Sequence, residues 1–462
     1  MKKLLYVLSI AVVASMILAA CGTPTPTAAP ATQAPATAAP ATQAPAPTAT
    51  QPPAKPAVPA LSGTVRVGSW DSADALAPFN NSITSFEAAN PGVKIQLEDV
   101  PQNYGDKLLA EFASGTAPDV FQVGDGDVAR FAAQGVFEPL DPYIAGTKGQ
   151  NPLDTSVFIP AVANIGKVNG TTYLLTKDSS PLVLYYNKKL FDAAKVAYPT
   201  DAWTWNDMLT AAKALTVTSG GKTTQWGLQL PDGWGDPTWV RGILPFIYQN
   251  GGDVISADGK KVTGYLDSDA TIAAIQFYGD FITKYKVAPS KADVAALNGA
   301  DLFQTGKVAM MWTGVWPLGT YIKDTTMSFG TTPLPAGPTG TRANSICWAG
   351  FAVYSKSQNK DAAWAFLRWM GADKGAQEFA KYALTDVKAI ADSQGKTTDP
   401  YYKSVMSDLA VVHPLPDFTT MKWNDCVNTP FAAALDTYFS KGGNLKTLLS
   451  KVATDGDTCL AK

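Results

Sequence analysis

The sequence predicts an α/β protein of two lobes, and three observations lead to this prediction. The chain has 462 residues, of which 46% are hydrophobic and 16% charged, which is enough to fill more than one core. Between residues 61 and 135, short apolar runs alternate with helical patterns, as in βαβ units with a mostly parallel sheet. Two more apolar runs, Tyr173–Thr176 and Leu182–Tyr186, flank a polar bend at 177–181. We interpret this stretch as a crossing between lobes with a ligand cleft beside it.

The N-terminus has the pattern of an exported protein. Met1–Lys3 is basic, an apolar stretch follows, and two alanines precede Cys21. The apolar stretch is too short and wrongly flanked for a membrane span, so residues 1–20 are predicted to be a signal peptide. Residues 18–21 resemble the bacterial lipobox, which implies cleavage before Cys21 and lipid attachment to its sulfur. An ordinary signal peptide followed by a chance cysteine is the alternative.

Residues 21–61 are made almost entirely of Pro, Ala, Thr and Gln. Because this segment offers almost no large apolar side chain to bury, it cannot offset the entropy that is lost on ordering. We therefore expect a disordered tether, biased toward polyproline II, that holds a globular body away from a membrane.

The first lobe is expected to alternate three strands with three helices. Apolar and polar residues alternate in the strands, and the helices end at glycines or at Asn90-Pro91-Gly92. Because ligands sit beyond the carboxyl ends of parallel strands, the loops that begin at Trp70, Pro101 and Gly124 share one rim. The strands are expected at 61–67, 93–98 and 119–123, and the helices at 75–89, from Tyr104 to Gly115, and from Val128 to Gly135.

Helix-capping signals mark the second lobe. Thr204 with Asp207 three residues later resembles a capping box, and Ser268 is the expected cap of a later helix. Further strands are predicted at 225–230, 307–312 and 346–354, and a further helix at 361–370.

Composition excludes several kinds of function. The formal net charge is −2, so no basic surface points to nucleic acid. The chain has a single histidine, His413, although general-base, triad and zinc chemistry depend heavily on histidine. No cysteine pair has the spacing of zinc ligands, so we expect neither a metal nor another cofactor.

One segment carries a family resemblance: Ala113–Val120, Ala-Ser-Gly-Thr-Ala-Pro-Asp-Val, is similar to the signature of family 1 extracellular solute-binding proteins. These proteins are receptors of ABC importers for sugars and are related to the maltodextrin-binding protein. The resemblance covers about residues 62–440 and implies a two-lobe type II periplasmic-binding-protein fold, with mostly parallel sheets and multiple hinge crossings. Further matching segments follow in the family's order at 184–191, 203–209, 306–316 and 363–367.

The resemblance also divides the chain between the lobes. It sends the strand at 307–312 back to the first lobe, and the strand at 346–354 would be a further crossing. Two or three crossings imply hinge closure rather than free tumbling of two domains. The expected N-terminal lobe is 62–175 plus about 306–345, and the expected C-terminal lobe is 176–305 plus about 346–462.

The cysteine count suggests one disulfide. With Cys21 lipidated, three of the four cysteines remain, so outside the cell at least one is unpaired or is paired between chains. Our hypothesis is a disulfide between Cys426 and Cys459 that pins the C-terminal segment, with Cys347 buried and reduced.

A sugar offers hydroxyls at its edges and apolar C–H patches on its faces, so its binding site needs aromatic platforms and planar polar groups. For each candidate platform, packing in a core or on a lobe surface is the alternative, and the resemblance favours Trp70, Trp316 and Trp348. The candidates are tryptophans beside glycine or aspartate, namely Trp70, Trp234, Trp316, Trp348 and Trp423.

The polar candidates lie mostly in loops or at strand ends. Asp125 and Asp127 follow a predicted strand, with a solvated turn or a helix cap as the alternative. Tyr185 is included because the Tyr185-Tyr186 pair lies in the crossing, where the sugar receptors also carry aromatics. Adjacent tyrosines bind ferric iron in some relatives of this fold, but no histidine is near this pair, which disfavours iron. The remaining candidates are Gln102, Tyr104, Asp178, Asp232 and Arg342.

We therefore expect a monomeric receptor, lipid-anchored to the outer face of the cell membrane, that closes on a neutral carbohydrate. It would deliver this carbohydrate to the permease subunits of an ABC importer. A neutral cargo is favoured because Arg130, Arg241 and Arg342 are scattered, and a polyol, a peptide or a phosphorylated sugar is the alternative. A lipid-anchored glycosidase with paired carboxylates is the alternative class. No nucleophile or metalloprotease motif is present, so we expect no catalysis.

Overall fold

The computed structural model describes residues 60–462 apart from 72, 125–126, 232–235 and 298–299. The predicted signal peptide, the lipidation site at Cys21 and all but the end of the predicted tether lie outside the described residues. So do three candidate site residues, Asp125, Asp232 and Trp234. No helix in the described part of the chain has both the length and the apolar character that crossing a membrane requires.

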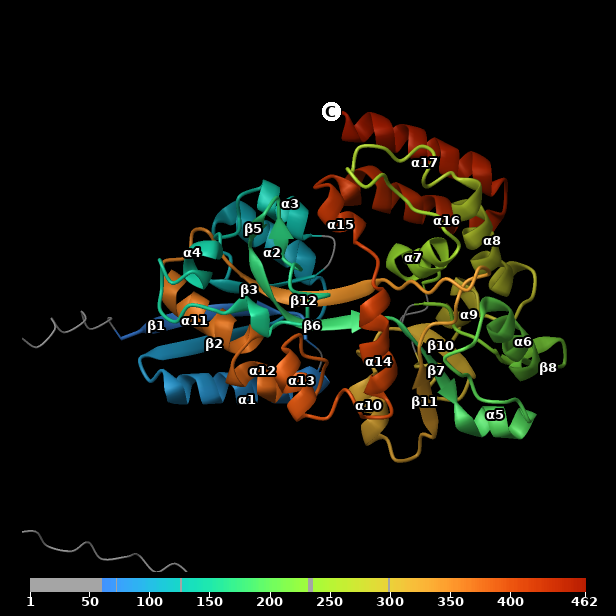
Figure 1. Ribbon diagram of the computed structural model, residues 1–462, viewed down its shortest axis with the longest axis horizontal. Coiled ribbons are helices and arrows are strands. Elements are labelled where there is room, and N and C mark those ends of the chain that lie inside the picture. The colour runs from blue at the N-terminus through green and yellow to red at the C-terminus, as the bar shows by residue number, and fades with distance from the viewer. Residues whose placement is uncertain (1–59, 72, 125–126, 232–235, 298–299) are drawn as a thin grey trace, which may run out of the picture. The chain divides into compact units, whose positions relative to one another are not determined.

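The first sheet has five strands in the order β2-β1-β3-β12-β6 (Figure 1). β1 pairs in parallel with β2 and β3, as the βαβ pattern predicts, whereas β12 lies antiparallel between β3 and β6. The ends of β1, β3 and β6 and the start of β12 therefore meet at one edge. The strands are β1 Gly63–Ser69, β2 Val93–Asp99, β3 Val120–Gly124, β6 Leu174–Pro181 and β12 Ile346–Val353.

Helices pack aromatic side chains against this sheet. Phe79 of α1 (Ala73–Ala89) stacks on Phe351 of β12 at 5.8 Å between ring centroids and meets Phe366 of α11 (Lys360–Gly371) edge-on at 6.5 Å. Such aromatic contacts join segments that are far apart in the sequence. The other helices of this part are α2 Tyr104–Ser114, α3 Val128–Ala133, α4 Asp141–Ile144, α12 Lys374–Phe379 and α13 Lys388–Ser393.

The second sheet has three strands in the order β10-β7-β11. β10 (Met310–Thr313) and β11 (Phe329–Thr332) both run antiparallel to β7 (Val183–Asn187). Parallel bridges at Trp226–Val308 and Gln229–Met311 place the predicted strand segment 225–230 beside β10. The first sheet is thus mixed, whereas the three strands of the second sheet pair only in antiparallel fashion, and the expectation of mostly parallel strands holds for the first sheet only.

The pairings correct two strand assignments. The strand expected at 307–312 was assigned to the first lobe, but it is β10 and belongs to the second sheet. The strand expected at 346–354 was assigned to the C-terminal lobe, but it is β12 and belongs to the first sheet. All residues of both strands are buried. Strands that are covered on both faces are apolar throughout, so their residue pattern does not identify the sheet to which they belong.

Several segments cross between the sheets. β6 continues into β7 through Leu182, and the chain returns from β11 to β12. A third crossing leads from α13 to α14 (Tyr402–Asp408), which contacts β6, β7 and β11. Multiple hinge crossings are therefore confirmed.

The predicted caps of the second part are present. The Thr204 side chain accepts from the Asp207 N–H, and the Asp207 carboxylate accepts in return, so the capping box is confirmed. Ser268 caps α8 by accepting from the Thr271 N–H. The helices here are α5 Lys188–Ala194, α6 Trp205–Leu215, α7 Val240–Gln249, α8 Asp269–Thr283, α9 Lys291–Ala295, α10 Leu318–Lys323, α15 Pro416–Thr419, α16 Thr429–Lys441 and α17 Leu445–Leu460.

Four short strands form two hairpins apart from the sheets. They are β4 Lys167–Val168 with β5 Thr171–Thr172, and β8 Val217–Ser219 with β9 Lys222–Gln225.

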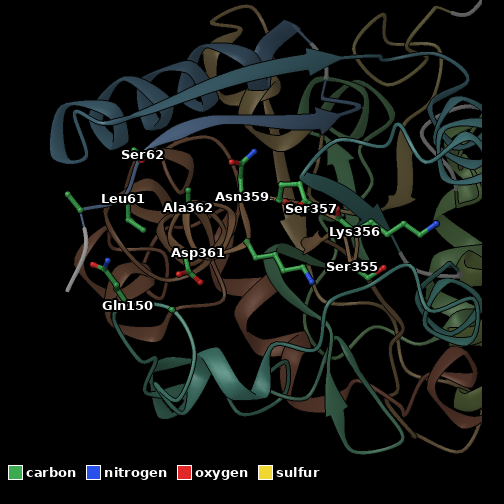
Figure 2. A pocket seen from close by; sticks show the side chains of 13 residues that line it. Leu61, Ser62, Gln150, Ser355, Lys356, Ser357, Asn359, Asp361 and Ala362 are labelled. Carbon is green, nitrogen blue, oxygen red and sulfur yellow. Dashed lines mark hydrogen bonds between the residues drawn. The ribbon is translucent and has the colours of Figure 1, made fainter. Parts of the chain in front are cut away.

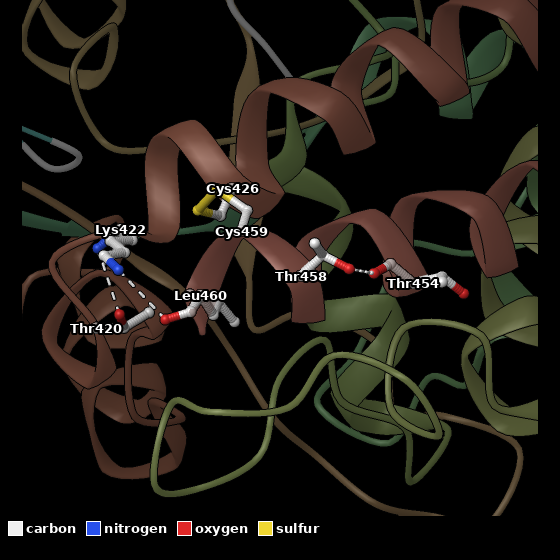
Figure 3. Close-up of a disulfide and its surroundings, with 7 residues drawn as sticks. All are labelled: Thr420, Lys422, Cys426, Thr454, Thr458, Cys459 and Leu460. Carbon is white, nitrogen blue, oxygen red and sulfur yellow. Dashed lines mark hydrogen bonds between the residues drawn. A yellow bond between two sulfur atoms is a disulfide. The ribbon is translucent and has the colours of Figure 1, made fainter. Parts of the chain in front are cut away.

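The disulfide between Cys426 and Cys459 is confirmed (Figure 3). It joins a π-helical turn, Asn424–Asn428, to the last turn of α17, with 5.5 Å between the two Cα atoms. The Lys422 ammonium donates to the Leu460 carbonyl beside it. The C-terminal helix is therefore pinned as predicted, and Cys347 is buried in β12 outside the disulfide.

Candidate functional site

Trp70 lies at the carboxyl edge of the first sheet, directly after β1. Its ring meets Tyr104 edge-on at 5.4 Å between centroids. The indole also covers Gly124, the last residue of β3, where an added Cβ would lie 3.4 Å from the ring. Trp70 is half-buried, so part of its surface faces outward.

A network of polar side chains holds the Trp70 loop to β3. The Gln122 Oε1 accepts from the Trp70 N–H at 3.3 Å and lies 2.8 Å from the Ser69 hydroxyl. That hydroxyl also lies 3.1 Å from Asp71 Oδ2. The Gln122 N–H in turn donates to the Tyr104 hydroxyl at 3.1 Å. Burial raises the pKa of Tyr104 well above its usual value, so the phenol stays neutral.

Lys177 connects this loop to β6. Its ammonium lies 2.6 and 2.9 Å from the two Asp71 carboxylate oxygens and 3.5 Å from Asp178. It also lies 4.5 Å from the centroid of the Phe379 ring. Burial alone would lower the pKa of Lys177, but attraction to Asp71 and Asp178 outweighs this and raises the pKa. Lys177 is therefore a buried cation with its charge balanced locally.

Two more carboxyl groups lie close to this pair. Burial raises the pKa of Asp178, although Lys177 opposes that shift. Asp386 is also buried, and burial together with the Asp178 charge raises its pKa to about 7. The polar interior of this edge therefore contains one cation, Lys177, and the three carboxyl groups of Asp71, Asp178 and Asp386. Burial favours the protonated forms of Asp178 and Asp386.

Trp348 and Trp316 lie beside the point where β6 leaves the first sheet. Trp348 is opposite Ser179 in the β12–β6 ladder and is 4% exposed. The next residue, Ser180, accepts from the Val315 N–H at 2.7 Å. A Cβ added to Gly314 would lie 1.9 Å from the Trp316 ring, which packs on that glycine.

The three tryptophans that the resemblance favours are thus brought to one edge, which we name the aromatic edge (Trp70, Trp348 and Trp316). Gly124, which Trp70 covers, is opposite Ala349 in the ladder, so the two residues point to the same face of the sheet. Trp348 is the neighbour of Ala349 in β12, and its side chain therefore projects from the other face. The three rings therefore flank the edge and do not form a single flat wall. Trp316 is half-buried and meets Trp239 edge-on at 6.0 Å, which extends the aromatic edge by one ring that the sequence did not indicate.

Three sequence-predicted site residues make contacts inside the protein. Tyr185 is 0% exposed in β7, and its hydroxyl donates to the Gly314 carbonyl. Trp423 is 4% exposed and packs in the core of the second part. The Arg342 guanidinium pairs with Asp408. The full burial of Tyr185 argues against ligand contact, because β7 is covered on both faces there. The assignments of Trp423 and Arg342 stay predictions, since Trp348 is equally buried and Asp127 is likewise paired with an arginine.

Two other candidates remain near the edge of the first sheet. Gln102 is exposed in the loop between β2 and α2. Asp127 precedes α3 and pairs with Arg130 at 2.6 Å. Burial raises the pKa of Asp127, with smaller contributions from Asp417 and Asp425, while Arg130 opposes the shift. α15 contacts α3, so acidic groups of the second part face the start of α3.

A pocket of about 740 Å³ lies at the opposite edge of the first sheet (Figure 2). It is lined by residues 60–62, which precede β1, by 149–150, and by 355–362, which follow β12. Its lining is mostly polar and contains no aromatic ring. It lies at the amino ends of the parallel strands, away from the edge where ligands of such sheets bind.

Four residues of this polar network were not among the sequence-predicted site residues, namely Asp71, Gln122, Lys177 and Asp386. The sequence predicted a polar bend at 177–181, but the structure continues β6 through these residues, so this expectation was wrong. Within a buried strand a lysine requires a nearby carboxylate, because lysine is almost never buried unpaired. The identity of the partner depends on contacts between distant segments. Among the described residues no group of three or more His, Cys, Asp or Glu side chains is arranged to hold a metal ion.

Comparison with known proteins identifies relatives over most of the chain. The profile of the family described as bacterial extracellular solute-binding protein matches residues 69–377. A Brucella abortus protein named only as a binding protein is 29% identical over 316 residues, which are 67% of this chain and 72% of the relative. The maltotriose-binding protein of Pyrococcus abyssi is 27% identical over 351 residues, 75% of this chain and 70% of the relative.

A solved structure is similar over the whole described fold. The ABC substrate-binding protein of Listeria monocytogenes in complex with cycloalternan has a TM-score of 0.75 at 25% identity. The match covers 87% of this chain and 99% of that one.

Proposed function

This chain belongs to the family of bacterial extracellular solute-binding proteins, and from that premise we propose that it is the receptor of an ABC importer for a neutral carbohydrate. The sugar binds at the aromatic edge, between the first sheet and the loop that carries Trp316. The maltotriose-binding relative and the cycloalternan complex of the Listeria protein support a carbohydrate as the ligand class.

The observation that carries the proposal is the position of the tryptophans. Trp70 and Trp348 stand at the carboxyl edge of the first sheet, and Trp316 follows β10 of the second sheet. Indole rings stack on the apolar faces of sugars, and carbohydrate hydroxyls need planar polar partners nearby. The proposed polar partners are Asp178, which is opposite Ala349 in the β12–β6 ladder, and Asp127, which precedes α3. A ligand held here touches elements of both sheets.

A neutral cargo is supported by the charge pairing around the site. Arg130 pairs with Asp127, Arg241 with Asp417, and Arg342 with Asp408. Lys177 is held by Asp71. A phosphorylated or carboxylated ligand is bound best by convergent cations that are not already neutralised.

Binding is coupled to closure about the crossings. A ligand shifts an open–closed equilibrium only if it binds one state more tightly, and contacts with both sheets provide that difference. The closed receptor docks as a monomer on permease subunits, and the lipid on Cys21 keeps it at the outer face of the membrane. The match to a family of extracellular solute-binding proteins supports the proposal that the carboxyl groups of the edge bind sugar hydroxyls rather than catalyse a reaction.

Calorimetry with mono- and oligosaccharides, preceded by a thermal-shift screen, tests the proposal. We expect saturable binding of at least one neutral sugar, together with a smaller radius of gyration by small-angle scattering when that sugar is bound. Saturable binding of a polyol, peptide or phosphorylated sugar, with no neutral sugar bound, would reject the cargo assignment. Release of product from a glycoside in the same samples would support the glycosidase alternative.

The anchor has a separate test. We expect mass spectrometry of the membrane-extracted protein to find an N-terminal peptide that begins at a diacylglyceryl-modified Cys21. An unmodified Cys21 within a longer mature chain would reject lipidation and leave the sugar proposal intact.

A further inference from the structure

We propose that Lys177 is a positioning residue, which locks the Trp70 loop to the crossing strand β6 and thereby fixes the orientation of the Trp70 platform. This inference rests on the proposed function for its role in binding. Its structural part, the lock itself, concerns contacts within the described residues alone.

A β-bulge aims Lys177 at the loop. In the ladder between β6 and β12, Asp178 is opposite Ala349 and Thr176 is opposite Gly350, so Lys177 is an extra residue. A bulge turns a side chain away from the regular alternation and bends its strand. The side chain of Lys177 reaches Asp71, which is 106 residues earlier in the sequence. The bulge occurs in the strand that leads from the first sheet to the second.

Only one residue, Asp71, stands between Lys177 and Trp70. Lys177 bonds both oxygens of Asp71, the residue after Trp70. At Trp70 itself, the Gln122 side-chain oxygen accepts a hydrogen bond from the backbone N–H. The Trp70 backbone is therefore held at two points, one on β3 and one on the crossing strand.

Burial gives this lock its rigidity. The side chains of Lys177 and Asp71 are 2% and 9% exposed, so water cannot replace either partner without opening the edge. Separating such a pair leaves an uncompensated buried charge, which is far more costly than losing an exposed ion pair. The Trp70 loop and β6 therefore move together when the crossing bends, and the platform keeps its orientation to the crossing strand.

Hydrogen–deuterium exchange of the protein without ligand tests the lock. In Lys177→Met, peptides covering 63–71 and 174–181 are expected to exchange faster by about tenfold or more, the scale of a local opening in the folded state. Asp71→Asn, which removes the negative partner by another route, should give the same two-site pattern. Lys360→Met is the matched control. It removes another lysine of the first lobe, which forms an ion pair of 2.8 Å with Glu138 and has no contact with Trp70 among the described interactions. Unchanged exchange at either site, or equal acceleration throughout the protein, would overturn the lock.

A double-mutant cycle tests the role in binding, with maltotriose as the probe and the sugars of the calorimetric screen in reserve. Lys177→Met is expected to weaken binding by about tenfold, as when an aromatic hot spot is displaced. It should have little effect in a Trp70→Ala background, because the lysine acts through that ring. Equal effects in both backgrounds would overturn the positioning role. If no sugar binds the wild type, the proposed function fails, while the exchange experiment still decides whether the lock exists.

Discussion

Replacing Asp386 with asparagine is expected to stabilise the protein at alkaline pH and to have little effect at acidic pH. The Asp386 side chain is buried, and neither carboxyl oxygen makes a hydrogen bond of standard geometry within the described residues. The hydroxyl groups of Ser179 and Thr176 favour the ionised form, but they offset burial only in part. An ionised carboxylate at this position is therefore poorly solvated.

The size of the effect follows from the pKa shift. Burial, with a smaller contribution from Asp178, raises the pKa of Asp386 from 3.8 to about 7. Between these values the folded protein keeps a proton that the unfolded chain has released. The free energy of unfolding should therefore fall as the pH rises through this window, by at most about 4 kcal/mol at 1.36 kcal/mol per pKa unit. Above pH 7 the full penalty is present, and below the unfolded-state pKa it vanishes.

Urea unfolding at pH 4.5 and pH 8 measures this difference, with fluorescence and far-UV circular dichroism followed together to check that the transitions coincide. Asp386→Asn removes the ionisable proton but keeps the shape and one carbonyl oxygen, so it should be more stable than the wild type at pH 8 only. Asp269→Asn is the control, because the Asp269 side chain is 92% exposed. A difference between Asp386→Asn and wild type that is the same at both pH values would refute the reasoning.

Three further predictions concern binding and stability. Trp316→Ala and Trp348→Ala should each weaken sugar binding by about 1–3 kcal/mol if the rings are platforms, and unchanged calorimetric affinity in both would reject that assignment. The Cys426→Ala/Cys459→Ala double variant should lose about 3.7 kcal/mol of the free energy of unfolding in urea. The reason is that the unfolded chain gains the entropy of a loop that closes a sequence separation of 33 residues. An unchanged midpoint would contradict this prediction. Thr204→Ala should cost about 1 kcal/mol, because it removes the cap of α6, and a smaller loss than that of an exposed mid-helix Thr210→Ala would count against the cap.

Local features of the fold could be predicted because their causes lie within a few residues. Thr204 and Asp207 are three residues apart, and their side chains and backbone satisfy one another without outside help. Gly115 ends α2 with a φ of 73°, a conformation that glycine adopts without a Cβ clash. The alternation of β1 and β2 likewise fixes which side chains turn inward.

Pairings between distant segments could not be predicted in the same way. β10 and β12 are apolar at every position, so alternation is absent, and either strand could have been placed in either sheet. The choice depends on partners such as β7 and β3, which lie more than a hundred residues away. The family resemblance supplied the order of the segments but assigned these two strands to the wrong lobes.

The candidate site was predictable in type but only partly in position. The position of Trp70 could be predicted, because the βαβ pattern sets the carboxyl edge of a parallel sheet, while its role in binding stays a prediction. Tyr185 failed because its strand is covered on both faces, which the sequence of one strand does not reveal. Lys177 was missed because its partner becomes visible only when β1 and β6 are in one sheet.

The arrangement of the aromatic edge limits which ligands can close the receptor. Trp70 and Trp348 belong to the first sheet, whereas Trp316 follows a strand of the second, to which Ser180 connects it through the Val315 N–H. A ligand that contacts only Trp70 binds the open and closed states equally and shifts no equilibrium, however tightly it binds. Under the proposed function, a ligand that reaches Trp316 as well would gain contacts when the two sheets approach. The separation of these two rings in the closed state would then set a minimum length for a transported sugar, and a shorter sugar that binds without closure would act as a competitor.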